Sequence, residues 1–463
     1  MSAPAEPFPE IAPALTPDQA LAAASRCLYC YDAPCVRACP TEIDIPAFIK
    51  KISTDNVAGS ARVIMGANVL GASCARVCPV EVLCEGACVE KAFVKAPVEI
   101  ARLQRYATDY AFARNVKLFE RGAPTGRSVA IIGSGPAGLG AAAELAKQGH
   151  VVTLFDEREL PGGLDTYGMA EYKMNKDVAL REVAILVEQL GVTVKQRTRV
   201  GRDASASEPG GRSAAASPTR GGGVVTHISI VELEQSFDAI FVGVGLGATQ
   251  RLGIPGEDLP NVREALSFIE ELKLGAAPSL AGKVAITLGA GNTAIDCVTQ
   301  AKLLGASESF IVYRRGPDDM PAFPYEYELA KSMDCGFRFH TQPVRIERRG
   351  ERLALICERT EMFYGALRHV ADSQHELLCD VVIEALGQEK RKSFLATLPI
   401  ELEASGRVKV NPKTGQTSNP KYFAGGDCVN GGSEAVNAVA EGKLAGKGLG
   451  AWLATQPARS SAA

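Results

Sequence analysis

Eight cysteines lie close together near the start of the chain, and thiols in such number can bind metal. The chain has 463 residues and 13 cysteines, eight of them between Cys27 and Cys88. The opening residues MSAPAEPFPE lack a basic segment followed by an apolar one, so no secretory signal is expected. In a reducing compartment, clustered thiols bind metal more often than they form disulfides. The clustering therefore predicts metal binding.

The spacing of these cysteines favours iron–sulfur clusters over other metal sites. The pattern is Cys27-x2-Cys30-x4-Cys35-x3-Cys39-Pro40, then Cys74-x3-Cys78-Pro79, then Cys84-x3-Cys88. In iron–sulfur proteins a cysteine before a proline often serves a second cluster, and Cys39 and Cys78 stand in such positions. Zinc, which prefers isolated C-x2-C pairs, and a disulfide framework remain the alternatives. Eight thiols could supply two complete sites, but spacing alone leaves open which ligand belongs to which.

A glycine-rich turn at 133–138 has the spacing G-x-G-x-x-G and follows the apolar run VAII. Its glycines permit a tight turn and a close approach of the backbone to a pyrophosphate, which would face a helix N-terminus. Asp156 ends the next predicted strand, where a carboxylate can bind a ribose hydroxyl. A second tight turn follows at 161–164. Near the C-terminus, Asp427 follows a strand and two glycines and precedes a helix predicted to start near Ser433.

A second glycine-rich turn at 289–294 follows the apolar run KVAITL and opens another predicted helix. Ala294 replaces the third glycine, which the nicotinamide-cofactor pattern tolerates. The next predicted strand ends in Tyr313-Arg314-Arg315 rather than in an acidic residue. Guanidinium groups there favour a ribose 2′-phosphate, hence NADPH, and two surface arginines are the alternative.

The elements that must position these motifs fall into distinct regions. Apolar residues recur at helical spacing in 45–54 and 98–116, so the cysteine-rich region is expected to be helical. Residues 127–455 contain two copies of a strand, a glycine-rich turn, an Ala-rich helix and a second strand. Two such units predict two nucleotide-binding domains. The low-complexity stretch at 201–223 is expected to be a solvated surface insertion.

Composition excludes several classes of protein. The formal net charge is −3, from 50 basic and 53 acidic residues, so no nucleic-acid partner is expected. No run of 18 apolar residues occurs, so no membrane span is expected. Glycine is abundant, at 46 residues, and aromatic residues make up only 6%, which fits nucleotide-binding α/β domains. A cytoplasmic protein is expected.

Residues 20–455 resemble a known family, the FAD-containing, iron–sulfur NAD(P)H dehydrogenase unit. Dihydropyrimidine dehydrogenase contains this unit, as its N-terminal half or as the separate bacterial PreT-type subunit, and so does glutamate synthase as its small subunit. The motifs that carry the resemblance are C-L-Y-C-Y-D-A-P-C-V-R-A-C-P at 27–40, C-A-R-V-C-P at 74–79, G-S-G-P-A-G at 133–138, G-A-G-N-T-A at 289–294, Y-R-R at 313–315 and F-A-G-G-D at 423–427.

The resemblance implies an α/β fold. An N-terminal α-helical iron–sulfur domain with two clusters would precede two Rossmann-like nucleotide-binding domains, one for FAD and one for NAD(P)H, the second inserted in the first. The expected domains are a mobile arm at 1–14, the helical iron–sulfur domain at 15–125, the FAD-binding domain in two parts at 126–250 and 376–455, the NAD(P)H-binding domain at 251–375, and a tail at 456–463.

The family also implies a ligand set for each [4Fe-4S] cluster. The first cluster would be held by Cys27, Cys30, Cys35 and Cys88. The second would be held by Cys39, Cys78, Cys84 and Gln104. Cys74 would then be a non-ligand, against the expectation of eight thiolates. Gln104 matches the dihydropyrimidine branch, because the glutamate synthase branch tends to carry an acidic residue there.

Contacts to the nucleotide cofactors are implied in the same way. Those to FAD are Gly133, Gly135, Pro136, Ala137, Gly138, Asp156, Gly163, Leu164, Lys173, Gly426, Asp427, Ser433, Glu434 and Ala435. Those to the nicotinamide cofactor are Ala290, Gly291, Asn292, Thr293, Arg314, Arg315, Ala385, Leu386 and Gly387. The chain departs from the family at Asp156, usually Glu, at Lys173, often Arg, and in DTYGMAEYKM at 165–174.

The implied function is electron input for a pyrimidine-reducing enzyme. NAD(P)H would pass a hydride to the flavin N5, and single electrons would leave through the two clusters to a catalytic subunit with FMN (PreA-like) in a hetero-oligomer. Hydride transfer needs no side-chain acid or base, so no catalytic residue is expected. The solitary Cys297 argues against a thioredoxin-reductase mechanism. The alternatives are a glutamate synthase small subunit, a related NAD(P)H:acceptor oxidoreductase, and a non-catalytic scaffold, against which the intact motifs argue.

Overall fold

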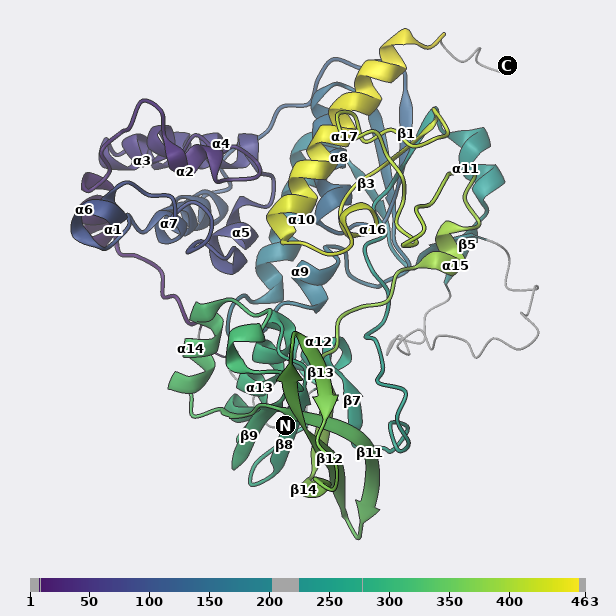
Figure 1. Cartoon of the computed structure of the whole chain (residues 1–463). Helices are drawn as coiled ribbons and strands as arrows, with labels where there is room; N and C mark the ends of the chain where they lie inside the picture. Colours follow the sequence, from purple (N-terminus) through teal and green to yellow (C-terminus); the bar gives the residue numbers. More distant parts are fainter. Residues whose placement is uncertain (1–7, 9, 202–224, 277, 458–463) are drawn as a thin grey trace, which may run out of the picture. The chain divides into compact units, whose positions relative to one another are not determined.

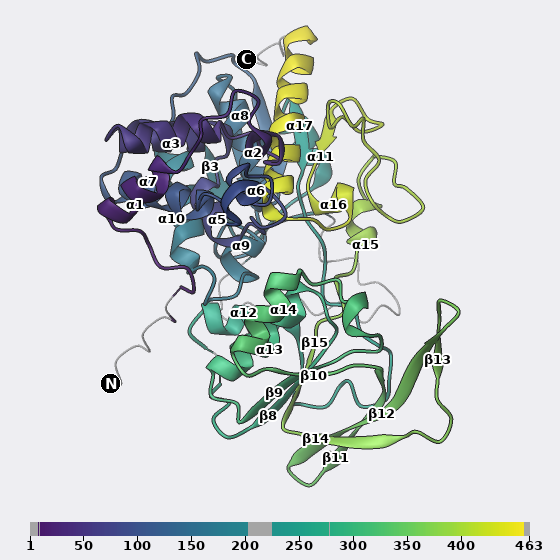
Figure 2. The same cartoon turned by 60° about the vertical axis from the view of Figure 1, so that its left-hand side comes forward.

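The structure is a computed structural model that describes residues 8, 10–201, 225–276 and 278–457 (Figures 1 and 2). These residues form two compact units. The inserted unit consists of Gly247–Glu389 with the short segment Tyr167–Tyr172, and the main unit contains nearly all the rest. The surface insertion expected at 201–223 lies outside the described residues apart from Gly201. The first seven residues of the expected arm and residues 458–463 of the expected tail also lie outside them.

The cysteine-rich part of the main unit is helical, as predicted. Its helices are α1 (Pro17–Ser25), α2 (Pro34–Arg37), α3 (Ile45–Ser53), α4 (Val57–Ala67), α5 (Gly71–Val77), α6 (Glu90–Val94) and α7 (Ile100–Ala113). In α3 the side chains of Ile45, Phe48, Ile49 and Ile52 are buried, at the i, i+3, i+4, i+7 spacing of an amphipathic helix. Asp44 caps this helix by accepting the backbone N–H of Ala47. The buried face packs against α4 and α7.

The rest of the main unit is built on a five-stranded parallel sheet with the order β16-β6-β1-β2-β3. The strands are β1 (Ser128–Ile132), β2 (Val151–Phe155), β3 (Thr193–Lys195), β6 (Ala239–Val242) and β16 (Tyr422–Ala424). One face packs against α8 (Pro136–Lys147), α10 (Lys176–Leu190) and α17 (Ala435–Thr455). The other face packs against α11 (Ile230–Ser236) and α15 (Lys392–Leu395). The smaller elements are β4 (Thr198–Val200), β5 (Thr226–Ile228), α9 (Leu164–Tyr167) and α16 (Asp427–Asn430).

The inserted unit contains a second five-stranded parallel sheet, of order β10-β9-β8-β15-β7. Its strands are β7 (Val262–Glu264), β8 (Val284–Leu288), β9 (Glu308–Val312), β10 (Gly336–Arg338) and β15 (Val381–Glu384), and its helices are α12 (Ala265–Lys273), α13 (Asn292–Leu303) and α14 (Pro324–Ser332). An antiparallel sheet that the sequence analysis did not anticipate follows in the chain. It comprises β11 (Thr341–Arg349), β12 (Arg352–Phe363), β13 (Ala366–His369) and β14 (His375–Cys379) (Figure 2).

Both glycine-rich turns therefore lie where this architecture places ligands. Each follows an inner strand, β1 or β8, at the carboxyl edge of a parallel sheet, and each opens a helix, α8 or α13. No single helix among the described residues is long and apolar enough to cross a bilayer. Helices α4 and α5 pass that test of length and composition only as a pair, and they bend by 86° at the break between them.

Candidate functional site

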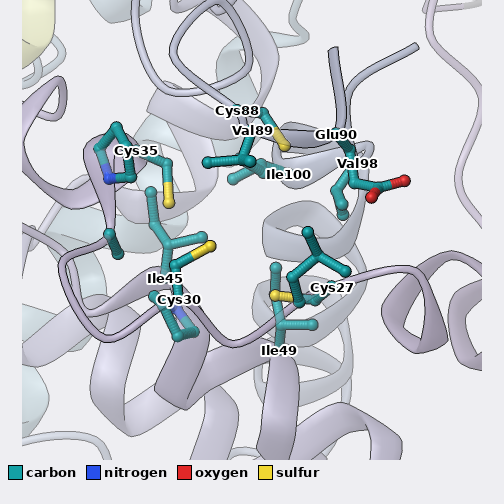
Figure 3. Close-up of a pocket in the computed structure, with 14 residues that line it drawn as sticks. Cys27, Cys30, Cys35, Ile45, Ile49, Cys88, Val89, Glu90, Val98 and Ile100 are labelled. Atoms are coloured by element: carbon teal, nitrogen blue, oxygen red, sulfur yellow. The ribbon is translucent and has the colours of Figure 1, made fainter. Parts of the chain in front are cut away.

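The four thiols predicted to hold the first cluster line one cavity (Figure 3). Cys27 and Cys30 follow α1, Cys35 lies in α2, and Cys88 precedes α6. The close-up shows the four sulfur atoms around a common space. Glu90 and apolar side chains complete the lining, the latter including Ile45 and Ile49 of α3, Val98 and Ile100.

A second cavity brings together the remaining predicted cluster ligands. Cys39, Cys78, Cys84 and Gln104 all line it, and so does Cys74. Gln104 is only 7% exposed, and its Nε2 donates to the carbonyl of Gly71 at 2.6 Å. This bond fixes which end of the amide is the donor. Among the described residues no hydrogen bond to its Oε1 is found, so this oxygen can serve as a ligand.

The spacing of these side chains fits a cluster better than a single ion. Within the described ranges, no three His, Cys, Asp or Glu side chains converge closely enough to hold one metal ion. A zinc ion would need its thiolates about 2.3 Å from one centre. A four-iron cluster binds one thiolate at each of several irons, so its ligands stand farther apart. All thirteen cysteines lie in the described part of the chain, and none forms a disulfide.

The electrostatics of both cavities favour neutral thiols unless a cationic group is bound. Burial, with the nearby thiols of Cys88 and Cys27, raises the pKa of Cys35 to about 11. A hydrogen bond with Cys74 and burial raise the pKa of Cys78 well above its usual value, and burial raises that of Cys84. Thiolates are unfavourable here unless positive charge compensates them, and bound metal deprotonates coordinating thiols. The residues present therefore fit iron–sulfur clusters.

The turn after β1 is rich in glycine and leaves its backbone uncovered by side chains. Gly133 has φ of +99°, and a Cβ there would lie 2.4 Å from the carbonyl oxygen of Gly243. A Cβ on Gly163 would lie 2.7 Å from the Cα of Gly135, so the two turns touch. Helix α8 begins after Gly135, with Pro136 in its first turn and no side chain to cap it. Its first N–H groups suit a pyrophosphate, and the binding of one by residues 133–138 stays a prediction.

Two carboxylates predicted to contact FAD lie beside these turns. Oδ2 of Asp156 accepts from both the backbone N–H, at 2.9 Å, and the hydroxyl, at 2.5 Å, of Ser134. Asp427 begins α16, and its Oδ1 accepts the N–H of Ser433 at 3.2 Å. Burial raises the pKa of Asp427. A Cβ on Gly426 would lie 2.8 Å from the Cβ of Ala137, so the turn after β16 touches α8.

The other residues predicted to contact FAD lie on adjoining segments. Leu164 begins α9, and Lys173 lies in the turn before α10. Ser433 and Glu434 lead into α17, whose first residue is Ala435. Gly138 lies inside α8, where a Cβ would be 2.1 Å from the carbonyl oxygen of Gly133.

The predicted nicotinamide-cofactor residues meet at the carboxyl edge of the inserted unit's sheet. Gly289 has φ of +114°, and a Cβ there would lie 2.3 Å from the carbonyl oxygen of Ala385. The turn after β8 therefore touches the turn formed by Ala385, Leu386 and Gly387 after the neighbouring strand β15. Helix α13 begins after Gly291, again without a side-chain cap. Ala290 and Asn292 hold the following loop, because the Ala290 carbonyl accepts from Ala322 and the Asn292 Oδ1 accepts from Phe323.

The two arginines after β9 differ in their surroundings. Arg314 is exposed, and its carbonyl accepts the hydroxyl of Thr360 at 2.6 Å. Arg315 is half-buried, and its Nε is buried with no hydrogen-bond partner in the part of the chain that the structure describes. An orphaned buried guanidinium nitrogen at this strand end suits an anionic ligand.

The second cavity also contains residues that the sequence analysis missed. Asn68, after α4, and Val436, in α17, line it. Val436 comes from the helix that follows the predicted FAD turn at 433–435, more than 300 residues from the cysteines. No spacing rule links such distant residues, so only the fold reveals them.

Fold and sites together define a flavoprotein that takes electrons from a nicotinamide nucleotide and contains iron–sulfur clusters. Residues 4–116 match the family model described as "Dihydropyrimidine dehydrogenase domain II, 4Fe-4S cluster", and residues 127–442 match "Pyridine nucleotide-disulphide oxidoreductase". The chain belongs to the pyridine nucleotide-disulphide oxidoreductase family, in the group with an N-terminal 4Fe-4S domain. The predicted fold class, family, cofactors and NAD(P)H-dependent oxidoreductase activity are confirmed.

Similar proteins cover almost the whole chain. The small chain of NADPH-dependent glutamate synthase from Escherichia coli K12 is 34% identical over 96% of this chain and 94% of its own. The subunit PreT of NAD-dependent dihydropyrimidine dehydrogenase from Escherichia coli O157:H7 is 32% identical over 96% of this chain and 97% of its own. The structure of FprA from Mycobacterium tuberculosis, at a TM-score of 0.54 and 20% identity, covers 71% of this chain and 85% of that one, and shows the fold alone.

Proposed function

We propose that this chain is the electron-input subunit of a dihydropyrimidine dehydrogenase, delivering electrons from NAD(P)H to a separate subunit that reduces uracil or thymine. The observation that carries the proposal is Gln104, whose amide lines the second cavity beside the cysteine thiols. A glutamine ligand there matches the dihydropyrimidine branch. FAD, when bound, takes up a hydride and passes electrons on singly to the clusters.

The residues proposed to bind each cluster line one of the two cavities. The first cluster is held by Cys27, Cys30, Cys35 and Cys88, and the second by Cys39, Cys78, Cys84 and Gln104. Val436 supports an order of electron flow, because it lines the second cavity and directly follows the FAD-contact turn at 433–435. Electrons from the flavin therefore enter the second cluster before the first.

The surface around the first cavity suits the exit of electrons to a partner. Tyr31 is fully exposed at 107%, next to Cys30, and Leu28, which lines the cavity, is 53% exposed. Phe93, in α6 close after Cys88, is 72% exposed. Exposed large apolar side chains can mark interaction sites, and aromatic residues are enriched in protein interfaces. We call Leu28, Tyr31 and Phe93 the exit face, and its proposed occupant is the electron-accepting subunit in a hetero-oligomer.

The nicotinamide preference and the compartment complete the proposal. Arg314 and Arg315 bind the 2′-phosphate of NADPH, which the orphaned Nε of Arg315 supports. Thirteen cysteines that form no disulfide among the described residues suit a reducing compartment such as the cytoplasm.

Reconstitution tests the proposed function. The anaerobically purified chain alone should reduce artificial dyes with NAD(P)H but leave uracil and thymine unchanged. Adding the FMN-containing catalytic subunit of a bacterial dihydropyrimidine dehydrogenase should produce NAD(P)H-dependent pyrimidine reduction. Reduction of uracil by the chain alone would contradict the proposal. So would coupling to a glutamine-hydrolysing glutamate synthase large subunit in place of the FMN subunit.

A further inference from the structure

Asn68 is a buried amide on the wall of the second cavity. It ends α4, where its backbone N–H bonds the carbonyl of Ile64 at 2.9 Å. Its relative exposure is 0%, and it lines the cavity together with Cys39, Cys78 and Cys84. It belongs to neither proposed ligand set. Buried polar atoms are nearly always hydrogen-bonded, so each polar atom of this fully buried asparagine is expected to have a partner.

One end of the Asn68 amide is satisfied and the other is not. Its Oδ1 accepts the backbone N–H of Leu70 at 3.0 Å. Because a backbone N–H can only donate, this contact identifies the oxygen and leaves Nδ2 at the other end. Nδ2 is buried and has no hydrogen-bond partner among the described residues. A buried donor without a hydrogen-bond partner destabilises the folded protein. The position of Nδ2 therefore suits an acceptor that the protein chain itself does not supply.

The segment that carries this amide is held from two sides. The carbonyl of Ala67, the preceding residue, accepts from the Lys443 ammonium on α17 at 3.0 Å. Leu70, two residues after Asn68 and directly before α5, donates its backbone N–H to Oδ1. The amide is therefore fixed before any ligand binds, which is what a preorganised donor needs.

We propose that Nδ2 of Asn68 donates a hydrogen bond to a sulfur atom of the cluster in the second cavity and thereby raises the reduction potential of that cluster. The inference rests on the proposed ligand set of Cys39, Cys78, Cys84 and Gln104. Reduction adds one electron, and so one negative charge, to the cluster. A hydrogen bond to sulfur stabilises the reduced form more than the oxidised form. The amide keeps its hydrogen in both states, so no proton moves.

The consequence for electron flow follows from the location of this cluster. Val436 lines the second cavity and directly follows the residues proposed to contact FAD at 433–435, so in the proposed assignment the second cluster would accept electrons from the flavin. A raised potential makes that transfer more favourable. Asn68 is therefore a positioning and tuning residue, which contacts the cluster without being a ligand.

The test compares Asn68→Leu with the control Ser60→Ala. Ser60 lies on the same helix, is equally buried, and donates to the Phe48 carbonyl at 2.9 Å, a bond unrelated to the cavity lining. Redox titrations followed by electron paramagnetic resonance should show that Asn68→Leu lowers the equilibrium constant for reduction of the second cluster about tenfold, a shift of about 59 mV for one electron. Iron content, the first cluster's potential and the Ser60→Ala protein should be unchanged.

An unchanged potential of the second cluster in fully loaded Asn68→Leu would overturn the inference. If Asn68→Leu does not incorporate the second cluster, the inference is tested on the unmodified protein with both clusters bound. With ¹⁵N in the asparagine side chains, the reduced second cluster should show a hyperfine coupling to ¹⁵N, and its absence would also overturn the inference. The signals are assigned with Cys30→Ser, which should lack the first cluster. Failure of the proposed ligand set is distinguishable, because Cys74→Ala would then lose about four irons, whereas the potential shift in Asn68→Leu reports on the amide alone.

Discussion

At the scale of single residues, the second cavity offers one more possible ligand than a four-iron cluster needs. Cys39, Cys74, Cys78, Cys84 and Gln104 all line it. Cys74 lies within α5, and its thiol interacts with that of Cys78 by a hydrogen bond that raises the pKa of Cys78. In the proposed assignment Cys74 lies beside the cluster and Gln104 takes the fourth ligand position.

Iron analysis distinguishes Gln104 from Cys74 as the fourth ligand of the second cluster. The unmodified chain, purified anaerobically, should contain one FAD and about eight irons, since two four-iron clusters are proposed. Cys74→Ala should retain about eight irons, whereas Cys84→Ala should retain about four because it loses a ligand. Loss of four irons from Cys74→Ala would show that Cys74 is the ligand and that the glutamine assignment is wrong.

The arginines after β9 give a prediction about cofactor preference. Arg315 has a buried Nε without a partner among the described residues, and a 2′-phosphate would supply one. Replacing Arg314 and Arg315 by Ala should raise the KM for NADPH more than tenfold and leave that for NADH little changed, because hydrogen bonds to charged groups contribute about 1.5–3 kcal/mol each. Steady-state dye reduction measures both constants. The exposed Arg348, in β11, provides the control variant Arg348→Ala. Equal use of both nucleotides by the unmodified protein would refute the assignment.

Residues that belong to a recognisable motif were predicted from the sequence, whereas residues outside any motif were missed. Cysteine spacing predicted two clusters, but the division of the ligands between the two cavities came from the family resemblance, because Cys88 and Gln104 lie far along the chain from their partners. Asn68 carried no such signal, because an asparagine after a helix is ordinarily a cap. Its burial depends on α5 and α17, which the local sequence does not encode.

At the scale of elements, α5 carries cavity residues and is held at its start from two sides. Gln104 of α7 donates to the Gly71 carbonyl. From α10, beside the FAD-binding sheet, the Glu182 carboxylate accepts the N–H groups of Ala72, at 2.7 Å, and of Ser73, at 3.2 Å, as well as the Ser73 hydroxyl. These bonds join the cysteine-rich helices to the part of the main unit that is built on the five-stranded parallel sheet.

Glu182 gives this junction a pH dependence. Burial raises its pKa from 4.5 to about 8, against the opposing effect of the Ser73 bond. Between these values the folded protein retains a proton that the unfolded chain has lost, so stability falls as pH rises through this window, by at most about 1.4 kcal/mol per pH unit. Glu182→Gln cannot ionise. Its thermal midpoint should therefore fall less between about pH 5 and pH 8 than that of the unmodified protein.

The exposed capping residue Glu232 supplies the control for this comparison. Glu232→Gln should show the same pH dependence as the unmodified protein over this window, because its pKa is lowered rather than raised. A fall in the midpoint of Glu182→Gln as steep as that of the unmodified protein would contradict the role given to Glu182.

The sequence predicted those elements that a local pattern encodes. Strand, glycine-rich turn and helix follow one another within about 25 residues, so β1 with α8 and β8 with α13 could be predicted. The antiparallel sheet β11–β14 could not. Its strand β12 pairs with three others, and their pairing depends on contacts across the sheet rather than on a turn motif.

At the scale of the whole molecule, the proposed exit face can be tested by its effect on partner binding. Tyr31→Glu combined with Phe93→Glu should weaken binding of the FMN-containing subunit by at least tenfold, because charge is unfavourable in the apolar centre of an interface. NAD(P)H-dependent dye reduction should remain unchanged. Tyr364→Glu alters an equally exposed aromatic residue in the inserted unit and should leave binding intact. If the double variant, Tyr364→Glu and the unmodified protein all bound the subunit equally, the partner would have to bind another surface.

The central claim is that electrons pass from the flavin through both clusters to the partner. The most direct measurement compares Cys35→Ser, which should lack only the first cluster, with the unmodified protein in the presence of the FMN-containing subunit. Its NAD(P)H-dependent dye reduction at the flavin should remain largely intact, while pyrimidine reduction should fall to background. Pyrimidine reduction at the unmodified rate in a variant shown by iron analysis to lack the first cluster would contradict the account.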